Sequence, residues 1–157
     1  MKKKKVVVIS LLLLLVSVIG ISSYFLFKDK INLLDVDHSA VDWNGKKQKD
    51  TSGEENTIAI PGFEKVTLYA NETTQAVNFH NPEINDCYFK ISLIHPDGSV
   101  LWISDLIEPG KGMYSIELEK TLAVGEYENA VLKYECFSLN DQSPLNGSEI
   151  NLKLVVV

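Results

Sequence analysis

The sequence contains no arginine, only two cysteines and none of the glycine-rich motifs that bind phosphate groups. All 15 basic residues are lysine, so the chain lacks the bidentate guanidinium group that usually binds phosphate or carboxylate. It has no Gly-x-Ser-x-Gly nucleophile elbow, no phosphate-binding loop and no dinucleotide-binding Gly-x-Gly-x-x-Gly motif. Only three histidines occur, and no two metal-ligating residues lie at a chelating spacing. We therefore expect a protein that is not an enzyme and binds neither a metal nor a cofactor.

The charge of the chain excludes a second class of partner. The part from Lys28 to Val157 carries 11 lysines against 21 acidic residues, and so has a net charge of −10. Such a surface repels nucleic acid phosphates and anionic lipid headgroups. We therefore expect no nucleic acid partner.

The longest uncharged run extends from Val6 to Phe27 and contains 22 residues. As a helix it would be roughly 33 Å long, enough to cross a hydrocarbon core of about 30 Å. A secretory signal peptide has a shorter apolar core of about 7–15 residues followed by small residues at its cleavage site. Here Ser17, Gly20 and Ser22 offer only a weak site of that kind. The run predicts a retained transmembrane signal-anchor helix, residues 6–27, with a cleaved signal peptide as the alternative.

The lysines on either side of this run predict its orientation. Four lysines, Lys2–Lys5, precede the run, whereas only Lys28 and Lys30 lie close behind it, on either side of Asp29. Positive charge next to a membrane span prefers the cytoplasm. We therefore expect residues 1–5 in the cytoplasm and the 130 residues from Lys28 onward outside the cell membrane.

Behind the anchor, residues 28–56 have the composition of a flexible extracellular linker. Residues 44–56 contain no apolar side chain and so cannot bury anything. Scattered apolar residues in the first part of the linker predict at most a short helix at the membrane surface. Residues 57–157 remain, a length that suits one domain with its own core.

In this domain, apolar and polar residues alternate over short runs that end at glycine, proline, asparagine or aspartate. Alternation with a period of two predicts half-buried strands, and no run has the period of a helix. We predict an all-β fold, an immunoglobulin-like antiparallel β-sandwich of seven or eight strands preceded by one transmembrane helix. The predicted strands are 58–60, 66–70, 77–79, 87–93, 100–103, 114–118, 130–136 and 150–156.

The alternation breaks before Ala130, since continuing it backwards would bury Glu128 and Glu126. The strand must therefore begin near Asn129 or carry a bulge. Tyr127 then lies at the corner before the strand, where we expect its hydroxyl to turn back to the backbone. This arrangement resembles the tyrosine corner of immunoglobulin-like sandwiches.

The two cysteines, Cys87 and Cys136, lie in the two longest alternating runs. The short turn 96–98 predicts a hairpin within one sheet, which argues against the inter-sheet disulfide of antibody domains. Directly opposed cysteines on neighbouring strands are within reach of a disulfide, which an extracellular position permits. Two buried free thiols are the alternative, and the sequence leaves both open. If the runs are antiparallel neighbours, the expected pairs are Cys87–Cys136, Phe89–Tyr134, Ile91–Leu132 and Leu93–Ala130.

Two segments of the sequence are similar to a group of other proteins. The runs "IPGFEKVTLYANETTQAVNFHNPEINDCYFKISL" and "LIEPGKG…LAVGEYENAVLKYECFSLNDQSPLNGSEINLKL" resemble an uncharacterised group of small membrane-anchored surface proteins of Gram-positive bacteria. The similarity covers most of Ile60 to Leu154. It implies a location at the bacterial cell surface and no activity.

The anchor, the linker and a sandwich without a catalytic motif predict a non-enzymatic extracellular module. We expect it to mediate protein–protein interaction with another protein of the cell envelope. The alternative is a domain that binds a cell-wall glycan or peptide. For this alternative, the aromatic residues Tyr88, Trp102 and Phe137 are the candidate binding residues.

Overall fold

The computed structural model describes residues 33–45 and 57–157, and those from Leu34 onward belong to one compact unit. The predicted cytoplasmic N-terminus and transmembrane helix, like residues 28–32 and 46–56 of the predicted linker, lie outside the described residues. Within the described ranges, no helix is long and apolar enough to cross a bilayer.

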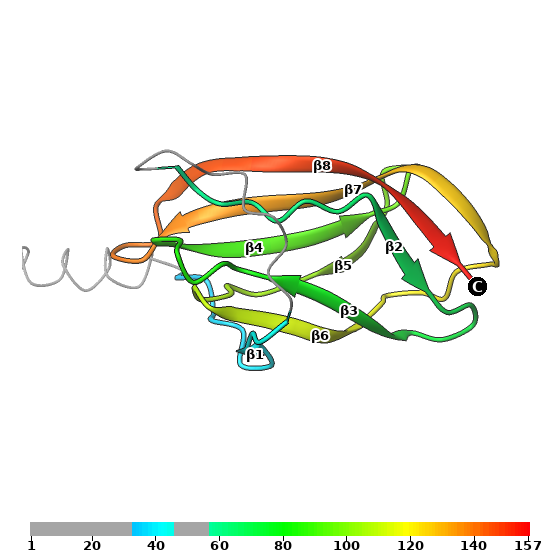
Figure 1. Cartoon of the computed structure of the whole chain (residues 1–157), viewed down its shortest axis with the longest axis horizontal. Coiled ribbons are helices and arrows are strands. Elements are labelled where there is room, and N and C mark those ends of the chain that lie inside the picture. The colour runs from blue at the N-terminus through cyan, green and yellow to red at the C-terminus, as the bar shows by residue number, and fades with distance from the viewer. Residues whose placement is uncertain (1–32, 46–56) are drawn as a thin grey trace, which may run out of the picture. The chain divides into compact units, whose positions relative to one another are not determined.

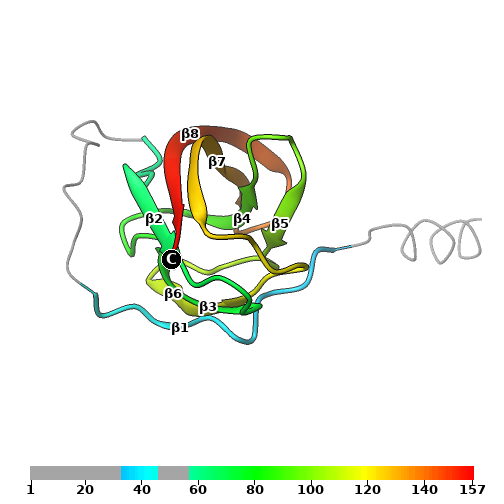
Figure 2. The same ribbon diagram turned by 90° about the vertical axis from the view of Figure 1, so that its right-hand side faces the viewer.

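The described part of the unit is built from strands in two layers (Figures 1 and 2). One sheet has the strand order β1-β6-β3, and the other has the order β2-β8-β7-β4-β5. All neighbouring strands are antiparallel except β2 and β8, which are parallel. The prediction of an all-β fold with two sheets is confirmed. The strands are β1 (Val41–Asp42), β2 (Lys65–Leu68), β3 (Thr74–His80), β4 (Cys87–Ile94), β5 (Val100–Ile103), β6 (Lys111–Glu117), β7 (Gly125–Ser138) and β8 (Pro144–Val156).

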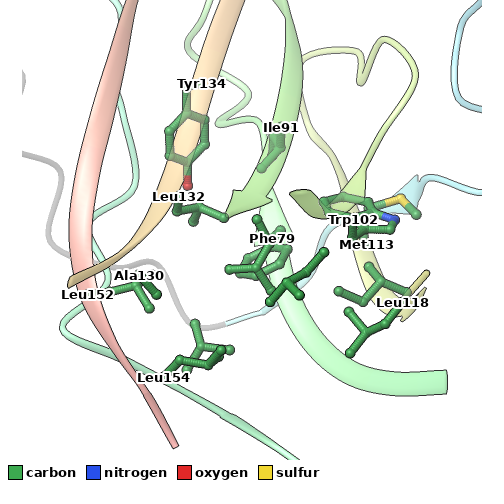
Figure 3. Packing of buried hydrophobic residues seen from close by; sticks show 14 of the residues in the cluster. Phe79, Ile91, Trp102, Met113, Leu118, Ala130, Leu132, Tyr134, Leu152 and Leu154 are labelled. Atoms are coloured by element: carbon green, nitrogen blue, oxygen red, sulfur yellow. The ribbon is translucent and has the colours of Figure 1, made fainter. Parts of the chain in front are cut away.

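The core lies between the two sheets and follows the alternation of the sequence. On β4 and β7, the side chains of Phe89, Ile91, Leu132 and Tyr134 are fully buried. Phe79 of β3 faces them from the other sheet, and in Figure 3 it lies between the labelled residues of β7 and those of β5 and β6. Burial of a large apolar side chain contributes about 1.5–3 kcal/mol, so these residues provide much of the stability.

The pairing of β4 with β7 differs from the expected register by two residues. Phe89 lies opposite Cys136, Ile91 opposite Tyr134, and Cys87 opposite Ser138. The expected pair Cys87–Cys136 is therefore wrong, although every side chain faces the predicted side. A shift by two residues leaves each side chain on the same face of the sheet, so the alternation alone cannot detect it.

The expected irregularity at the start of β7 is confirmed as a bulge. The pairing of β7 with β8 shifts between Tyr127 and Ala130, and Asn129 has a φ of 63°. The bulge leaves Glu126 and Glu128 exposed, each within an ion-pair distance of the Lys153 ammonium group, at 3.0 and 2.6 Å respectively.

Tyr127 itself turns back as expected. Its hydroxyl donates a hydrogen bond of 2.9 Å to the carbonyl oxygen of Ala123, four residues earlier. The predicted return of the Tyr127 hydroxyl to the backbone is confirmed.

The strand predicted at 58–60 is not formed. Ala59, rather than Ile58 or Ile60, is the buried residue of this stretch. The side chain of Asn85 replaces a neighbouring strand, because it accepts a hydrogen bond from the Ala59 amide (2.7 Å) and donates one to the Ala59 carbonyl oxygen (2.9 Å). A polar side chain thus satisfies backbone groups that the alternation pattern assigned to a sheet.

The predicted linker is shorter than expected, because residues 34–45 are part of the sandwich. We call these residues the N-terminal strap. The Asp37 amide donates a hydrogen bond to Leu106 (2.8 Å), and the Trp43 amide donates one to Gly110 (2.9 Å). Between them, β1 pairs with β6 and forms an edge of the three-stranded sheet. At the start of the strap, the Gln142 side chain forms two hydrogen bonds with the backbone of Leu34.

Candidate functional site

Two of the three predicted binding residues meet on the outer face of the five-stranded sheet. Tyr88 of β4 lies directly opposite Phe137 of β7. Both side chains are half-buried, whereas the residues on either side of Tyr88 point into the core. The next outward pair along the strands is Lys90 opposite Glu135. An aromatic pair therefore lies beside a charged pair on this face.

The third candidate, Trp102, is not on the surface. It is 7% exposed, and its ring centroid lies 5.8 Å from that of Phe79 in the core. Its partner on β4 is Leu93, which is fully buried, so the pairing turns Trp102 inward. The prediction that Trp102 forms part of a binding platform is therefore wrong.

Beside Phe137 the outer face is hollowed. A pocket of about 320 Å³ is lined by Phe137, Pro144 and Leu145 together with charged residues of both signs. Leu145 is 43% exposed. Gly147 allows the close approach of β8 here, because a Cβ atom at this position would lie 2.2 Å from the Tyr134 carbonyl oxygen. We call Tyr88 and Phe137 the outer aromatic patch.

Both cysteines are buried free thiols. They lie on neighbouring strands but diagonally, since Cys136 is opposite Phe89. The pKa of Cys136 is raised, first by its hydrogen bond with Cys87 and then by burial. A disulfide between the two stays a prediction, which the loss of two hydrogens in the intact mass would show.

A second pocket, which the sequence analysis missed, lies where the strap meets the ends of β3 and β6. We call it the end pocket; its volume is about 740 Å³. Its wall includes Trp43, whose ring stacks on that of His80 with a centroid distance of 3.8 Å and an interplanar angle of 10°. The Trp43 indole N–H also donates a hydrogen bond to the Asn78 side-chain oxygen (2.7 Å). The remaining lining residues are Asp42, Asn44, Gly45, Ala59, Ile60, Pro61, Pro82, Glu83, Ile84, Pro109, Gly110 and Lys111.

The polar groups of the end pocket have distinct environments. His80 is 3% exposed, and burial lowers its pKa, which keeps the imidazole neutral at pH 7. Within the described ranges, no group forms a hydrogen bond with its Nδ1 atom. At the rim, the Lys111 ammonium group lies 2.5 Å from the Asp42 carboxylate, and this hydrogen bond lowers the pKa of Asp42.

Two buried asparagines hold one wall of the end pocket in place. The Asn81 side chain donates hydrogen bonds to the carbonyl oxygens of Cys87 (2.8 Å) and Ile107 (2.9 Å). The Asn85 amide donates a further one to the Asn81 side-chain oxygen (2.8 Å). The residues between them, Pro82 to Ile84, line the pocket, so this network fixes the loop that forms the wall.

Comparison of the chain with protein-family models, curated proteins and solved structures finds no match. In the part of the chain that the structure describes, no group of three or more histidine, cysteine, aspartate or glutamate side chains could hold a metal ion. The functional argument therefore rests on the outer aromatic patch and the end pocket.

Proposed function

We propose that the chain is a membrane-anchored extracellular module that binds another protein of the cell envelope, without catalytic activity. The outer aromatic patch is the observation that carries this proposal. Tyr88 and Phe137 face away from the core, beside the charged pair Lys90 and Glu135. Aromatic residues within a polar surround are typical of protein–protein interfaces, where they often dominate the binding energy.

The proposed fold type is an immunoglobulin-like sandwich. Three observations support it: β3 pairs with β6 in one sheet, β8-β7-β4-β5 are neighbours in the other, and β2 runs parallel to β8. The hydroxyl of Tyr127, at the corner before the long part of β7, returns to the backbone as in a tyrosine corner. Such a domain presents its sheet faces and loops to partners without a catalytic apparatus.

The location rests on the sequence. The uncharged run from Val6 to Phe27 and the lysines before it support a location of the sandwich outside the cell membrane, and the resemblance of the sequence supports the surface of a Gram-positive bacterium. Mass spectrometry of the mature protein tests this part. The intact N-terminal run in the membrane fraction is the expected result, whereas a soluble species that begins near Ile21 to Tyr24 would make the protein secreted.

Affinity capture from cross-linked membranes tests the binding role. We expect the full chain to capture one or more envelope proteins, and the double variant Tyr88→Ser/Phe137→Ser to lose them. The matched control is Tyr69→Ser/Val124→Ser, which replaces an exposed aromatic and an exposed aliphatic residue outside the patch. Equal capture by both double variants would contradict the outer aromatic patch as the binding surface.

Binding of a cell-wall glycan or peptide is the second candidate function, and the end pocket favours it. A concave site of about 740 Å³ has the size of sites for small ligands. A glycan-array screen with the full chain separates this role from the first. Binding to a glycan that survives Tyr88→Ser/Phe137→Ser would favour the second candidate.

A further inference from the structure

The end pocket is a site separate from the outer aromatic patch, and the inference drawn from it does not depend on that patch. We propose that the end pocket binds a short peptide segment that contains a primary amine, with the ammonium group at Glu83 and neighbouring apolar groups on the proline wall. The primary amine is a lysine side chain.

The size of the pocket limits the occupant to a short segment. Its volume of about 740 Å³ lies within the range of about 300–1,000 Å³ that is typical of small-ligand sites. A few amino acid residues fill such a volume, whereas a folded protein surface does not enter it.

The wall of the pocket suits the apolar part of such a segment. Pro61, Pro82 and Pro109 line it, and Ile84 beside them is 73% exposed. Proline carries no backbone N–H group, so these positions offer carbon surface without a competing donor. An isoleucine as exposed as Ile84 gains from being covered, by about 25 cal/mol for each Å² of apolar surface removed from water.

The charges at the pocket favour a cation. Lys111 provides the ammonium group of the lining, and it already pairs with Asp42. Within the described ranges, Glu83 forms no ion pair, and its side chain is exposed at the pocket. Among the described residues, the lining therefore has one carboxylate in excess, in a chain whose part from Lys28 onward has 11 lysines against 21 acidic residues. This charge distribution attracts a cationic ligand and repels an anionic one.

The pocket is pre-organised for binding. The hydrogen bonds of Asn81 and Asn85 fix the loop that carries Glu83. Gly110, with a φ of 77°, lies close to Glu83, and its amide donates a hydrogen bond of 2.9 Å to the carbonyl oxygen of Asn81. A site that is ordered before binding loses less conformational entropy on binding.

The stacked pair at the pocket includes a buried polar atom without a partner among the described residues. The Nδ1 atom of His80 is buried and without a hydrogen-bond partner among the described residues. A buried polar atom in this state costs free energy.

The test uses the full chain in detergent micelles and the indole N–H signal of Trp43 in NMR spectra. The Trp43→Phe variant identifies this signal, since Trp102 is the other tryptophan. The probes are three peptides, acetyl-Ala-Lys-Ala-amide and its norleucine and glutamate counterparts. We expect a saturable shift of the Trp43 signal with the lysine peptide, and affinity lower by about tenfold or more for the norleucine peptide. No shift is expected with the glutamate peptide.

Two variants test whether the Glu83 carboxylate binds the ammonium group of the peptide. Glu83→Gln removes the proposed carboxylate at an exposed position, and we expect it to weaken binding of the lysine peptide by about tenfold. Glu119→Gln, also exposed and outside the pocket lining, is the matched control and should leave the affinity unchanged. The proposal is overturned by the absence of a saturable shift, by equal affinity for the lysine and norleucine peptides, or by equal loss in both variants. A shift caused by an N-acetylglucosamine oligomer and not by the lysine peptide would also overturn it, in favour of a glycan site.

Discussion

The two sheets of the sandwich are completed in different ways. The five-stranded sheet contains the long strands β7 and β8, joined by a hairpin, and its inner face follows the alternation of the sequence. The three-stranded sheet has shorter strands and a bulge in β3, and its edge is formed by the N-terminal strap, whose sequence predicts a linker. The difference teaches that a periodic apolar pattern specifies one layer, whereas scattered contacts such as the Trp43–His80 stack complete the other.

The largest loss of stability on substitution is expected in the five-stranded sheet. Phe89 is fully buried and its ring lies 5.3 Å from that of Tyr134, so we expect Phe89→Ala to lower the free energy of unfolding by about 3–5 kcal/mol. Tyr88→Ala, on the outer face of the same strand, should cost much less. Urea denaturation of a chain that starts at Leu34 measures both. A larger loss for Tyr88→Ala would mean that the outer face is the packed one.

A smaller effect is expected where the strap closes the three-stranded sheet. Trp43 is half-buried, stacks on His80 and donates a hydrogen bond to Asn78. Trp43→Ala should therefore lower the free energy of unfolding by about 2 kcal/mol, less than for a fully buried aromatic residue. The control Val41→Ala changes a residue of the strap that is 50% exposed, and should have an effect below about 0.5 kcal/mol. Equal effects of the two substitutions would show that the stack does not hold the strap.

The corner at the start of β7 should contribute still less to the free energy of unfolding. Tyr127→Phe removes only the hydroxyl that donates to Ala123, so a loss of about 1 kcal/mol is expected from thermal or urea unfolding. Tyr69→Phe is the matched control, because Tyr69 is 54% exposed and its hydroxyl forms no hydrogen bond with the described residues. Equal stability of these two variants would show that the hydrogen bond from the Tyr127 hydroxyl does not stabilise the fold.

The smallest expected effect is a pH dependence that His80 contributes. Burial lowers the pKa of His80 below its unfolded value of about 6.5, so the unfolded chain binds the proton more readily. Its contribution to stability is fully present above pH 7 and is lost as the pH falls through the lowered pKa of the folded state. His80→Gln should flatten the dependence of the unfolding free energy on pH between 7 and 5. An unchanged slope would contradict a neutral, buried His80.

The sequence could predict the layers and the faces of the strands but not every partner. The alternation around Phe89 and Tyr134 identifies the inner face of the five-stranded sheet, and the acidic residues beside Tyr127 reveal the bulge. The register of β4 was missed by two residues, because such a shift buries the same side chains.

The candidate site was predicted only in part, for reasons that particular residues show. Tyr88 and Phe137 fall on the outer face because they alternate with buried residues. Trp102 lies in a short run of apolar residues without alternation, so its inward direction depends on the pairing with Leu93. The end pocket was missed because Trp43 lies in a mostly polar segment and Asn85 in a turn, and in both cases the contacts come from distant parts of the chain.

Hydrogen exchange of the full chain tests most directly the claim that the N-terminal strap completes the sandwich. The amides of Asp37 and Trp43 donate to Leu106 and Gly110, so we predict that both exchange far more slowly than they would in an unstructured chain. The Trp43→Ala variant should lose this protection in the strap while the amides of β7 and β8 remain protected. Exchange of the Asp37 and Trp43 amides at the rate of an unstructured chain would contradict the account.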